Sequence, residues 1–319
     1  MRATNSEEPL LQFYEVTDTT ANRSLLRQPH CWVDVARPSN DELLQLREEF
    51  GIPKRFLRDA LDPDERSRFV RVEDRLLFVI QVSHDLGSVS ATPHDTVPLA
   101  VILSPDHVFT VCEHRHTVLL EIKQGRTPAI ATAQPMQFAL ELFRRVAEGY
   151  LADLREIDRR LEQLESRLER STRNREILDL MRVEKSLVYF KVALKSNTLM
   201  LERLRHDRQI NLEPEHQGLI EEVIVEHRQA IEMTDIALGI VGTMMSAFGS
   251  VISNNANAVV HRLTVATVMI AVPTWITGVF GMNVVIPWEK EPWAFGVVIL
   301  LCLSAVLGTL AMFRWRGWL

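Results

Sequence analysis

Several features that mark common protein classes are missing from this sequence. Its only three cysteines, Cys31, Cys112 and Cys302, lie far apart without a CxxC pair, so neither a disulfide framework nor a thiolate metal site is expected. A net charge of −6 at pH 7 argues against a nucleic-acid partner. The sequence shows no Walker motif, other nucleotide signature or catalytic constellation, so an enzyme is the least favoured class and no organic cofactor is expected.

Two further absences concern targeting and metal ligands. The amino-terminal segment lacks the apolar core of a signal peptide, so the region before the apolar runs described below is expected in the cytosol. The histidines share no metal-ligand spacing within one element, so we interpret them as scattered polar residues rather than a zinc site: His114, His116, His227 and His261.

Charge is also absent from two long stretches near the carboxyl terminus, residues 263–280 and 293–313. As helices with a rise of about 1.5 Å per residue they would measure roughly 27 and 32 Å, enough to cross a hydrocarbon core of about 30 Å. We therefore predict two transmembrane helices. A loop over 281–292 separates them, and residues 314–319 form a short basic tail.

The flanking charges predict how the two spans are oriented. Basic side chains lie before the first span and after the second, whereas the loop between them holds one lysine and two glutamates. By the positive-inside rule both termini are expected on the cytoplasmic side of the cell membrane, with the loop outside. The flanking basic residues are His261, Arg262, Arg314 and Arg316.

Residues 1–130 are predicted to form a cytosolic α/β domain. Ser39 and Glu42 have the spacing of a capping box, which indicates a helix through Phe50, and Pro53 indicates another through Ala60. Isolated apolar runs indicate a mostly buried sheet with helices on its faces. These strand-like runs are residues 11–16, 30–35, 75–82, 97–103 and 107–113.

From about residue 131 the pattern changes to that of long helices. Apolar residues at 3-4 spacing form a coiled-coil-like stripe, which predicts a helical hairpin over 131–212. The stripe includes Leu154, Ile157, Leu161, Leu164 and Leu168. A helical pattern then continues from Pro214 to Phe280 with Pro273 as its single internal proline. Residues 213–280 are therefore expected to form a stalk helix, about 100 Å long, that continues into the first span.

One face of the first span differs in composition from the others. At heptad spacing it carries small, hydroxyl-bearing or amide side chains and one valine, whereas the flanking positions are mostly bulky and apolar. Two interpretations stay open, because such a face suits close packing of membrane helices and also suits an ion pathway. Two spans cannot enclose a channel, so a pathway requires a symmetric ring of chains. This small-residue face consists of Asn257, Val260, Thr264, Thr267, Ala271, Thr274 and Gly278.

The tripeptide Gly281-Met282-Asn283 follows the first span directly. By itself it reads as an ordinary helix cap and turn. In this position, before a short loop and a second span, it resembles the signature Tyr-Gly-Met-Asn of the CorA family of divalent-cation transporters. The resemblance covers the whole chain, with Phe280 and Val284 replacing the usual Tyr and Phe.

This resemblance implies a funnel-shaped homopentamer in which five copies of Asn283, with Gly281 and Met282, form a selectivity filter at the outer mouth. Mg2+ dehydrates reluctantly, and amide oxygens can accept hydrogen bonds from its water shell without holding it too tightly to release. A membrane potential supplies about 4.6 kcal/mol per 100 mV for a double charge. Glu289 and Glu291 would either concentrate cations at the mouth or belong to an ordinary solvated loop.

In the family, cytosolic carboxylates at the subunit interface bind Mg2+ and hold the pore closed. The matching positions here are Asp59, after a short helix, and Glu222 on the stalk helix. Mg2+ would then be both transported and regulatory. Arg58 and Ser246 replace acids of relatives, which implies a weaker or differently built sensor. Without the resemblance, Asp59 and Glu222 would be ordinary surface acids.

The leading hypothesis is a membrane channel or transporter for Mg2+, also passing Co2+ or Ni2+, driven by the electrochemical gradient and gated by cytosolic Mg2+. A zinc transporter of the ZntB-like branch on the same fold is the alternative, which proton-coupled uptake would favour. A membrane-anchored coiled-coil scaffold or sensor is a remote third hypothesis, and it leaves the small-residue face unexplained.

Overall fold

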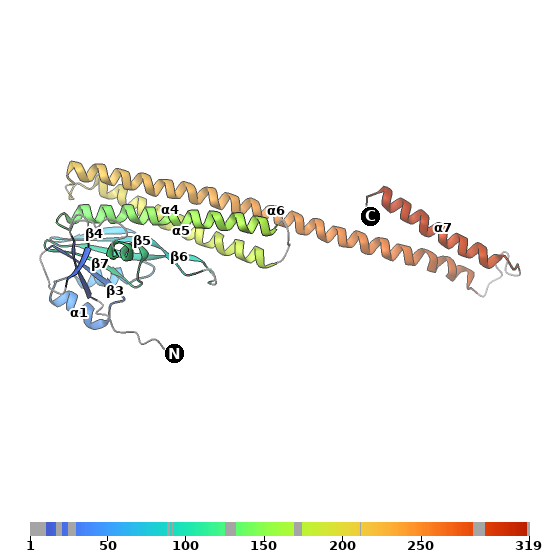
Figure 1. Ribbon diagram of the computed structural model, residues 1–319, viewed down its shortest axis with the longest axis horizontal. Coiled ribbons are helices and arrows are strands. Elements are labelled where there is room, and N and C mark those ends of the chain that lie inside the picture. The colour runs from blue at the N-terminus through green and yellow to red at the C-terminus, as the bar shows by residue number, and fades with distance from the viewer. Residues whose placement is uncertain are drawn as a thin grey trace. The chain divides into compact units, whose positions relative to one another are not determined.

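The computed structural model describes residues 11–16, 21–24, 30–87, 90, 92–124, 132–168, 174–210, 212–282 and 291–317. The chain divides into two compact units, Met1–Thr243 and Met244–Leu319. Helix α6 (Pro214–Phe280) contributes to both units (Figure 1).

A mixed sheet of seven described strands forms the centre of the first unit. The spatial order is β2-β1-β3-β7-β6-β5-β4, with β3 and β7 parallel and the other neighbouring pairs antiparallel. In chain order these strands are β1 (Leu11–Val16), β2 (Ala21–Ser24), β3 (Cys31–Ala36), β4 (Arg68–Val72), β5 (Arg75–Asp85), β6 (His94–Leu103) and β7 (His107–Cys112). The five predicted strands are confirmed with small shifts at their ends. The short edge strands β2 and β4 were not predicted.

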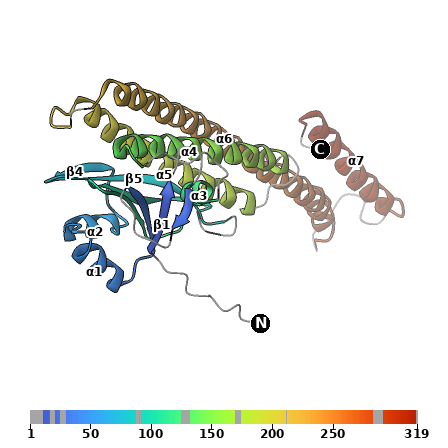
Figure 2. The ribbon, with the colours of Figure 1, turned by 60° about the vertical axis from the view of Figure 1, so that its left-hand side comes forward.

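Helices cover both faces of the sheet, as Figure 2 shows for α1 and α2 on one side and α4 and α5 on the other. Strand β3 illustrates the reason, because Val33 packs into the core beneath α1 and α2 while Trp32 contacts Phe138 of α4 with ring centroids 5.8 Å apart. Burial on both faces explains the nearly continuous apolar runs of these strands. The helices are α1 (Asn40–Glu48), α2 (Lys54–Ala60), α3 (Thr117–Lys123), α4 (Pro135–Leu168) and α5 (Asn174–His206).

The predicted capping box at the start of α1 is confirmed. The Ser39 hydroxyl accepts a hydrogen bond from the Glu42 N–H at 3.3 Å, and the Glu42 carboxylate accepts one from the Ser39 N–H at 2.8 Å. Each side chain thus satisfies an amide that the helix leaves without a partner. Helix α1 ends at Glu48, two residues before the predicted end, and Gly51 then takes a left-handed conformation with φ of 63°.

The long helices lie where the sequence predicts them. Leu154, Ile157, Leu161 and Leu164 of α4 are buried, and α6 has the predicted bounds. Ion pairs between α5 and α6 show that these helices run antiparallel, because the residue numbers of the α5 partners fall as those of the α6 partners rise. The pairs are Arg205–Glu221 (3.2 Å), Arg228–Glu202 (2.5 Å) and Lys191–Asp235 (2.7 Å).

The second unit consists of the remaining length of α6 and of α7 (Ala294–Trp315). Both helices are long and apolar enough to cross a membrane. Of their most apolar stretches, only 6% is buried in α6 and none in α7. A core helix of a water-soluble protein would bury such a surface, so this exposure favours contact with lipid.

Candidate ion pathway and regulatory cluster

Helix α6 ends directly before the predicted filter. The Gly281 N–H donates to the Thr277 carbonyl at 2.9 Å, which closes the last turn. Gly281 does not take the left-handed conformation of a common glycine cap. A Cβ atom at this position would instead lie 3.3 Å from the Thr277 carbonyl oxygen, so a side chain would crowd the helix end. Met282 is exposed, as is Glu291, whereas Asn283 and Glu289 lie outside the described residues.

Most of the small-residue face of α6 is free of packing within the chain. All its members are exposed except Thr264, which is half-buried. A neighbouring stripe of the same helix is buried or half-buried along its length: Val265, Val268, Val272 and Ile276. At Gly278 a Cβ atom would meet nothing within 4 Å, so packing of this chain does not require the glycine. The face is therefore available to neighbouring chains or to solvent in a pore.

The threonine hydroxyl groups on this face are oriented by their own helix. Thr264, Thr267 and Thr274 each donate to the carbonyl four residues earlier, at 2.8, 2.8 and 2.7 Å. A hydroxyl oxygen that has donated its proton still has lone pairs that accept hydrogen bonds. The face thus presents a row of neutral acceptors, which suits the water hydrogens around a hydrated cation.

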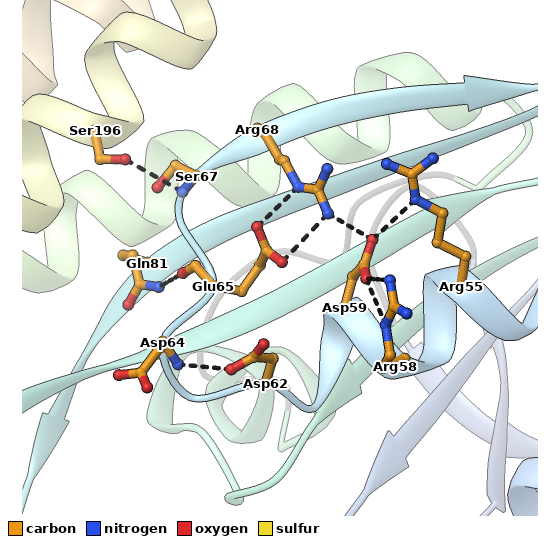
Figure 3. A network of polar contacts seen from close by, with 10 residues as sticks. All are labelled: Arg55, Arg58, Asp59, Asp62, Asp64, Glu65, Ser67, Arg68, Gln81 and Ser196. Carbon is orange, nitrogen blue, oxygen red and sulfur yellow. Dashed lines mark hydrogen bonds and ion pairs between the residues drawn. The ribbon is translucent and has the colours of Figure 1, made fainter.

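Asp59 lies at the centre of an arginine cluster on the first unit (Figure 3). This residue is 3% exposed, so the interpretation of Asp59 as an ordinary surface acid is wrong. Oδ1 accepts from Arg58 Nη2 at 3.1 Å, while Oδ2 accepts from Arg68 Nη2 at 2.5 Å and lies 3.6 Å from Arg55 Nε. Arg68 also pairs with Glu65 at 2.8 Å. Three guanidinium groups therefore compensate this buried carboxylate.

With these arginines in place, a Mg2+ ion could bind Asp59 only by displacing a guanidinium donor. A divalent cation needs free carboxylate oxygens, and here both oxygens already accept hydrogen bonds from positively charged donors. Across the described part of the chain, no group of three or more His, Cys, Asp or Glu residues is arranged to hold a metal ion. Glu222 differs from Asp59, because it is exposed on α6 and has no ion pair with another described residue.

Sequence reasoning identified none of the three arginines as a partner of Asp59, and it singled out Arg58 only as a replacement for an acid of relatives. Arg55 precedes Asp59 by four residues on α2, and this spacing places oppositely charged side chains on one face of a helix, so the signal was present. Arg68 lies on β4, whose pairing with β5 was not predicted, so no local pattern identifies this contact.

The two deeply buried histidines have local structural partners. His116 Nε2 lies 2.6 Å from the Ser83 carbonyl oxygen, and His227 Nδ1 lies 2.9 Å from that of Val223. Burial lowers the pKa of each to about 4, because a charged imidazolium would lose its hydration. Both are therefore neutral at physiological pH.

Comparison with known proteins gives a consistent picture. The CorA-like Mg2+ transporter protein family matches residues 27–315. The chain is similar to the cobalt/magnesium transport protein CorA of Methanocaldococcus jannaschii, at 25% identity over 294 residues that cover 90% of this chain and 91% of that protein. The complete structure of the CorA magnesium transporter from the same organism has a TM-score of 0.84 at 22% identity, covering 97% and 99%. The ZntB cytoplasmic domain from Vibrio parahaemolyticus has a TM-score of 0.60 at 13% identity, covering 77% and 98%. At these identities, the structural matches establish the fold alone.

Proposed function

The chain belongs to the CorA-like family of divalent-cation transporters, and we propose that it conducts Mg2+ through a membrane pore formed by a homopentamer. The first span, within α6, lines this pore and α7 faces lipid. Both termini and the whole first unit lie in the cytoplasm, and residues 281–292 lie outside. The membrane potential drives entry, because a double charge gains about 4.6 kcal/mol per 100 mV.

The observation that carries this proposal is the unpartnered small-residue face with its oriented threonine hydroxyls. Packing of α7 leaves this face exposed, and its hydroxyl oxygens are acceptors of neutral charge. Neutral acceptors attract the water shell of Mg2+ but bind the ion less tightly than a carboxylate would. Weaker binding suits conduction, because the ion must leave again. A ring of identical chains brings several copies of the face together around one axis.

Ion selection is proposed to occur at Asn283, with Gly281 and Met282 shaping the approach. Mg2+ loses its coordinated waters with difficulty. Amide oxygens that bind the hydrated ion therefore favour Mg2+ over ions that bind only after losing their water shell. Glu289 and Glu291 are proposed to raise the local cation concentration at the mouth. The exposure of Glu291 is compatible with this role.

We also propose that cytosolic Mg2+ regulates the chain by binding at Asp59 and Glu222. The contacts of the two residues differ, and this difference limits how strongly they could bind the ion. Glu222 has an exposed carboxylate, whereas Mg2+ would have to compete with Arg55, Arg58 and Arg68 for Asp59. We therefore propose a weak sensor that responds only to high Mg2+ concentrations.

Uptake by proteoliposomes, with Mg2+, Co2+, Ni2+ and Zn2+ in competition, tests the function. Mg2+ uptake driven by an inside-negative potential, with Co2+ and Ni2+ as competitors, is expected. Zn2+ uptake that requires a proton gradient would favour the ZntB-like alternative, and no uptake of any metal would support a scaffold. Native mass spectrometry in mild detergent tests the ring separately: a stable monomer or dimer would contradict the pentamer.

A further inference from the structure

An arginine-lined cleft of about 940 Å3 lies between α4 and α5, and the proposed transport mechanism does not use it. Helix α4 contributes three arginines to its lining, and α5 contributes two. The arginines are Arg159, Arg160, Arg167, Arg175 and Arg182, and the acids that also line the cleft are Glu156 and Asp179.

The positive charge of this cleft is only partly compensated. Arg182 pairs with Asp179 at 3.1 Å. The described residues provide no ion pair for Arg160, Arg167 or Arg175. Among the described residues that line the cleft, five guanidinium groups stand against two carboxylates, a local excess of three positive charges in a chain whose net charge is −6. Like charges repel one another, and an anion that enters the cleft would relieve this repulsion.

The arginine side chains that line the cleft indicate which kind of anion it would bind. The charged groups facing the cleft from both helices include five arginines and no lysine. A guanidinium is planar, always protonated and suited to bidentate contact with phosphate oxygens, whereas an ammonium acts as a point charge. The volume lies in the range of ligand pockets, which is larger than a single phosphate requires. Leu164 and Leu178 add an apolar part to the lining.

We infer that this cleft binds a phosphate-bearing polyanion, which bridges α4 and α5 through Arg160, Arg167 and Arg175. The ligand is either a soluble polyphosphate or the headgroups of anionic phospholipids, since both offer the same phosphate oxygens. Binding would join the two helices through charge-assisted hydrogen bonds, so it would also make the hairpin harder to unfold. The inference does not depend on which ion the chain transports.

The test is calorimetric titration of the full chain with sodium tripolyphosphate, in nanodiscs of phosphatidylcholine and without divalent cations. We expect saturable binding, and this binding should weaken when salt is added. Substitution of Arg160, Arg167 and Arg175 together by Gln should weaken binding at least tenfold. Arg203→Gln is the matched control, because Arg203 is exposed on α5 but does not line the cleft, and it should leave binding unchanged.

The same titration in nanodiscs that contain phosphatidylglycerol distinguishes the two sources of phosphate, soluble polyphosphate and lipid headgroups. Unchanged tripolyphosphate affinity there would assign the cleft to a soluble polyphosphate, and affinity lost through competition would assign it to lipid headgroups. Absence of binding in phosphatidylcholine nanodiscs, or equal binding by the triple variant, would overturn the inference. If the triple variant does not fold, Arg167→Gln and Arg175→Gln singly, both at exposed positions, provide the same comparison. Metal uptake by the same variants in proteoliposomes reports separately on the proposed function.

Discussion

Arg58 donates to a single oxygen of its neighbour Asp59, from Nε at 3.3 Å and from Nη2 at 3.1 Å. The other carboxylate oxygen accepts from Arg68. A residue expected to face a metal at a subunit boundary is thus satisfied from inside its own chain. Removing the carboxylate and removing an arginine should therefore have different consequences.

Asp59→Asn should destabilise the first unit, because it leaves Arg55 and Arg58 near a buried amide without a compensating charge and leaves Arg68 paired with Glu65 alone. Removal of one partner of a buried ion pair costs about 3–5 kcal/mol, and partial exposure of Arg55 and Arg58 reduces this to on the order of 2 kcal/mol. Thermal unfolding of the full chain measures the effect. Asp62→Asn is the matched control, since Asp62 is exposed and its carboxylate accepts from the Asp64 N–H rather than from an arginine of the cluster. Equal melting temperatures for the two variants would contradict the buried cluster.

Arg58→Gln should make the sensor more responsive, because one competitor for the Asp59 carboxylate is removed. Less Mg2+ should then be needed to protect α6 from protease, with the half-maximal concentration falling several-fold. Arg47→Gln is the control, because Arg47 is an exposed arginine on the neighbouring helix α1 and does not contact Asp59. If the Mg2+ dependence of protection is the same in the parent and both variants, the sensor does not involve Asp59.

Thr267→Val should reduce Mg2+ flux and leave assembly intact, because it removes one hydroxyl acceptor per chain from the small-residue face. Thr277→Val is a close control, since Thr277 is exposed on the same helix and donates to the carbonyl of Pro273 at 3.0 Å, but lies off that face. Stopped-flow fluorescence of a Mg2+ indicator inside liposomes compares the two. Equal flux losses would indicate a general effect on the span rather than a pore face.

Acid should destabilise the chain partly through His227. Burial lowers its folded-state pKa from 6.5 to about 4, so the unfolded state binds a proton more readily between these values. Stability from this group is complete above pH 6.5 and falls as the pH drops toward 4. His227→Leu should therefore lose less stability than the parent between pH 7 and pH 5 in thermal unfolding. An identical loss in parent and variant would show that His227 is not buried in its neutral form.

Much of this architecture could be predicted because strong physical constraints act on short stretches of sequence. Lipid requires each span to be apolar along its length, which makes residues 263–280 and 293–313 conspicuous. Strands such as β5 and β7 are buried on both faces and so appear as apolar runs. Strand β4 is different, because Arg68 and Arg71 interrupt its apolar residues at the edge of the sheet.

The arginine cluster around Asp59 was harder to predict, because it depends on contacts between separate stretches of the chain. The contact from Arg68 to Asp59 depends on how β4 pairs with β5 and where α2 then lies, and neither follows from local spacing. The proposed filter depends on other copies of the chain, so its sequence signal was recognisable only through resemblance.

The most direct test of the transport proposal is the Mg2+ flux of the Asn283→Ala variant in proteoliposomes under an inside-negative potential. Asn283 lies outside the described residues, and it is the residue proposed to receive hydrated Mg2+. We expect that the parent conducts Mg2+ and that Asn283→Ala assembles as the parent does but loses nearly all flux. Unchanged flux in Asn283→Ala would contradict this proposal.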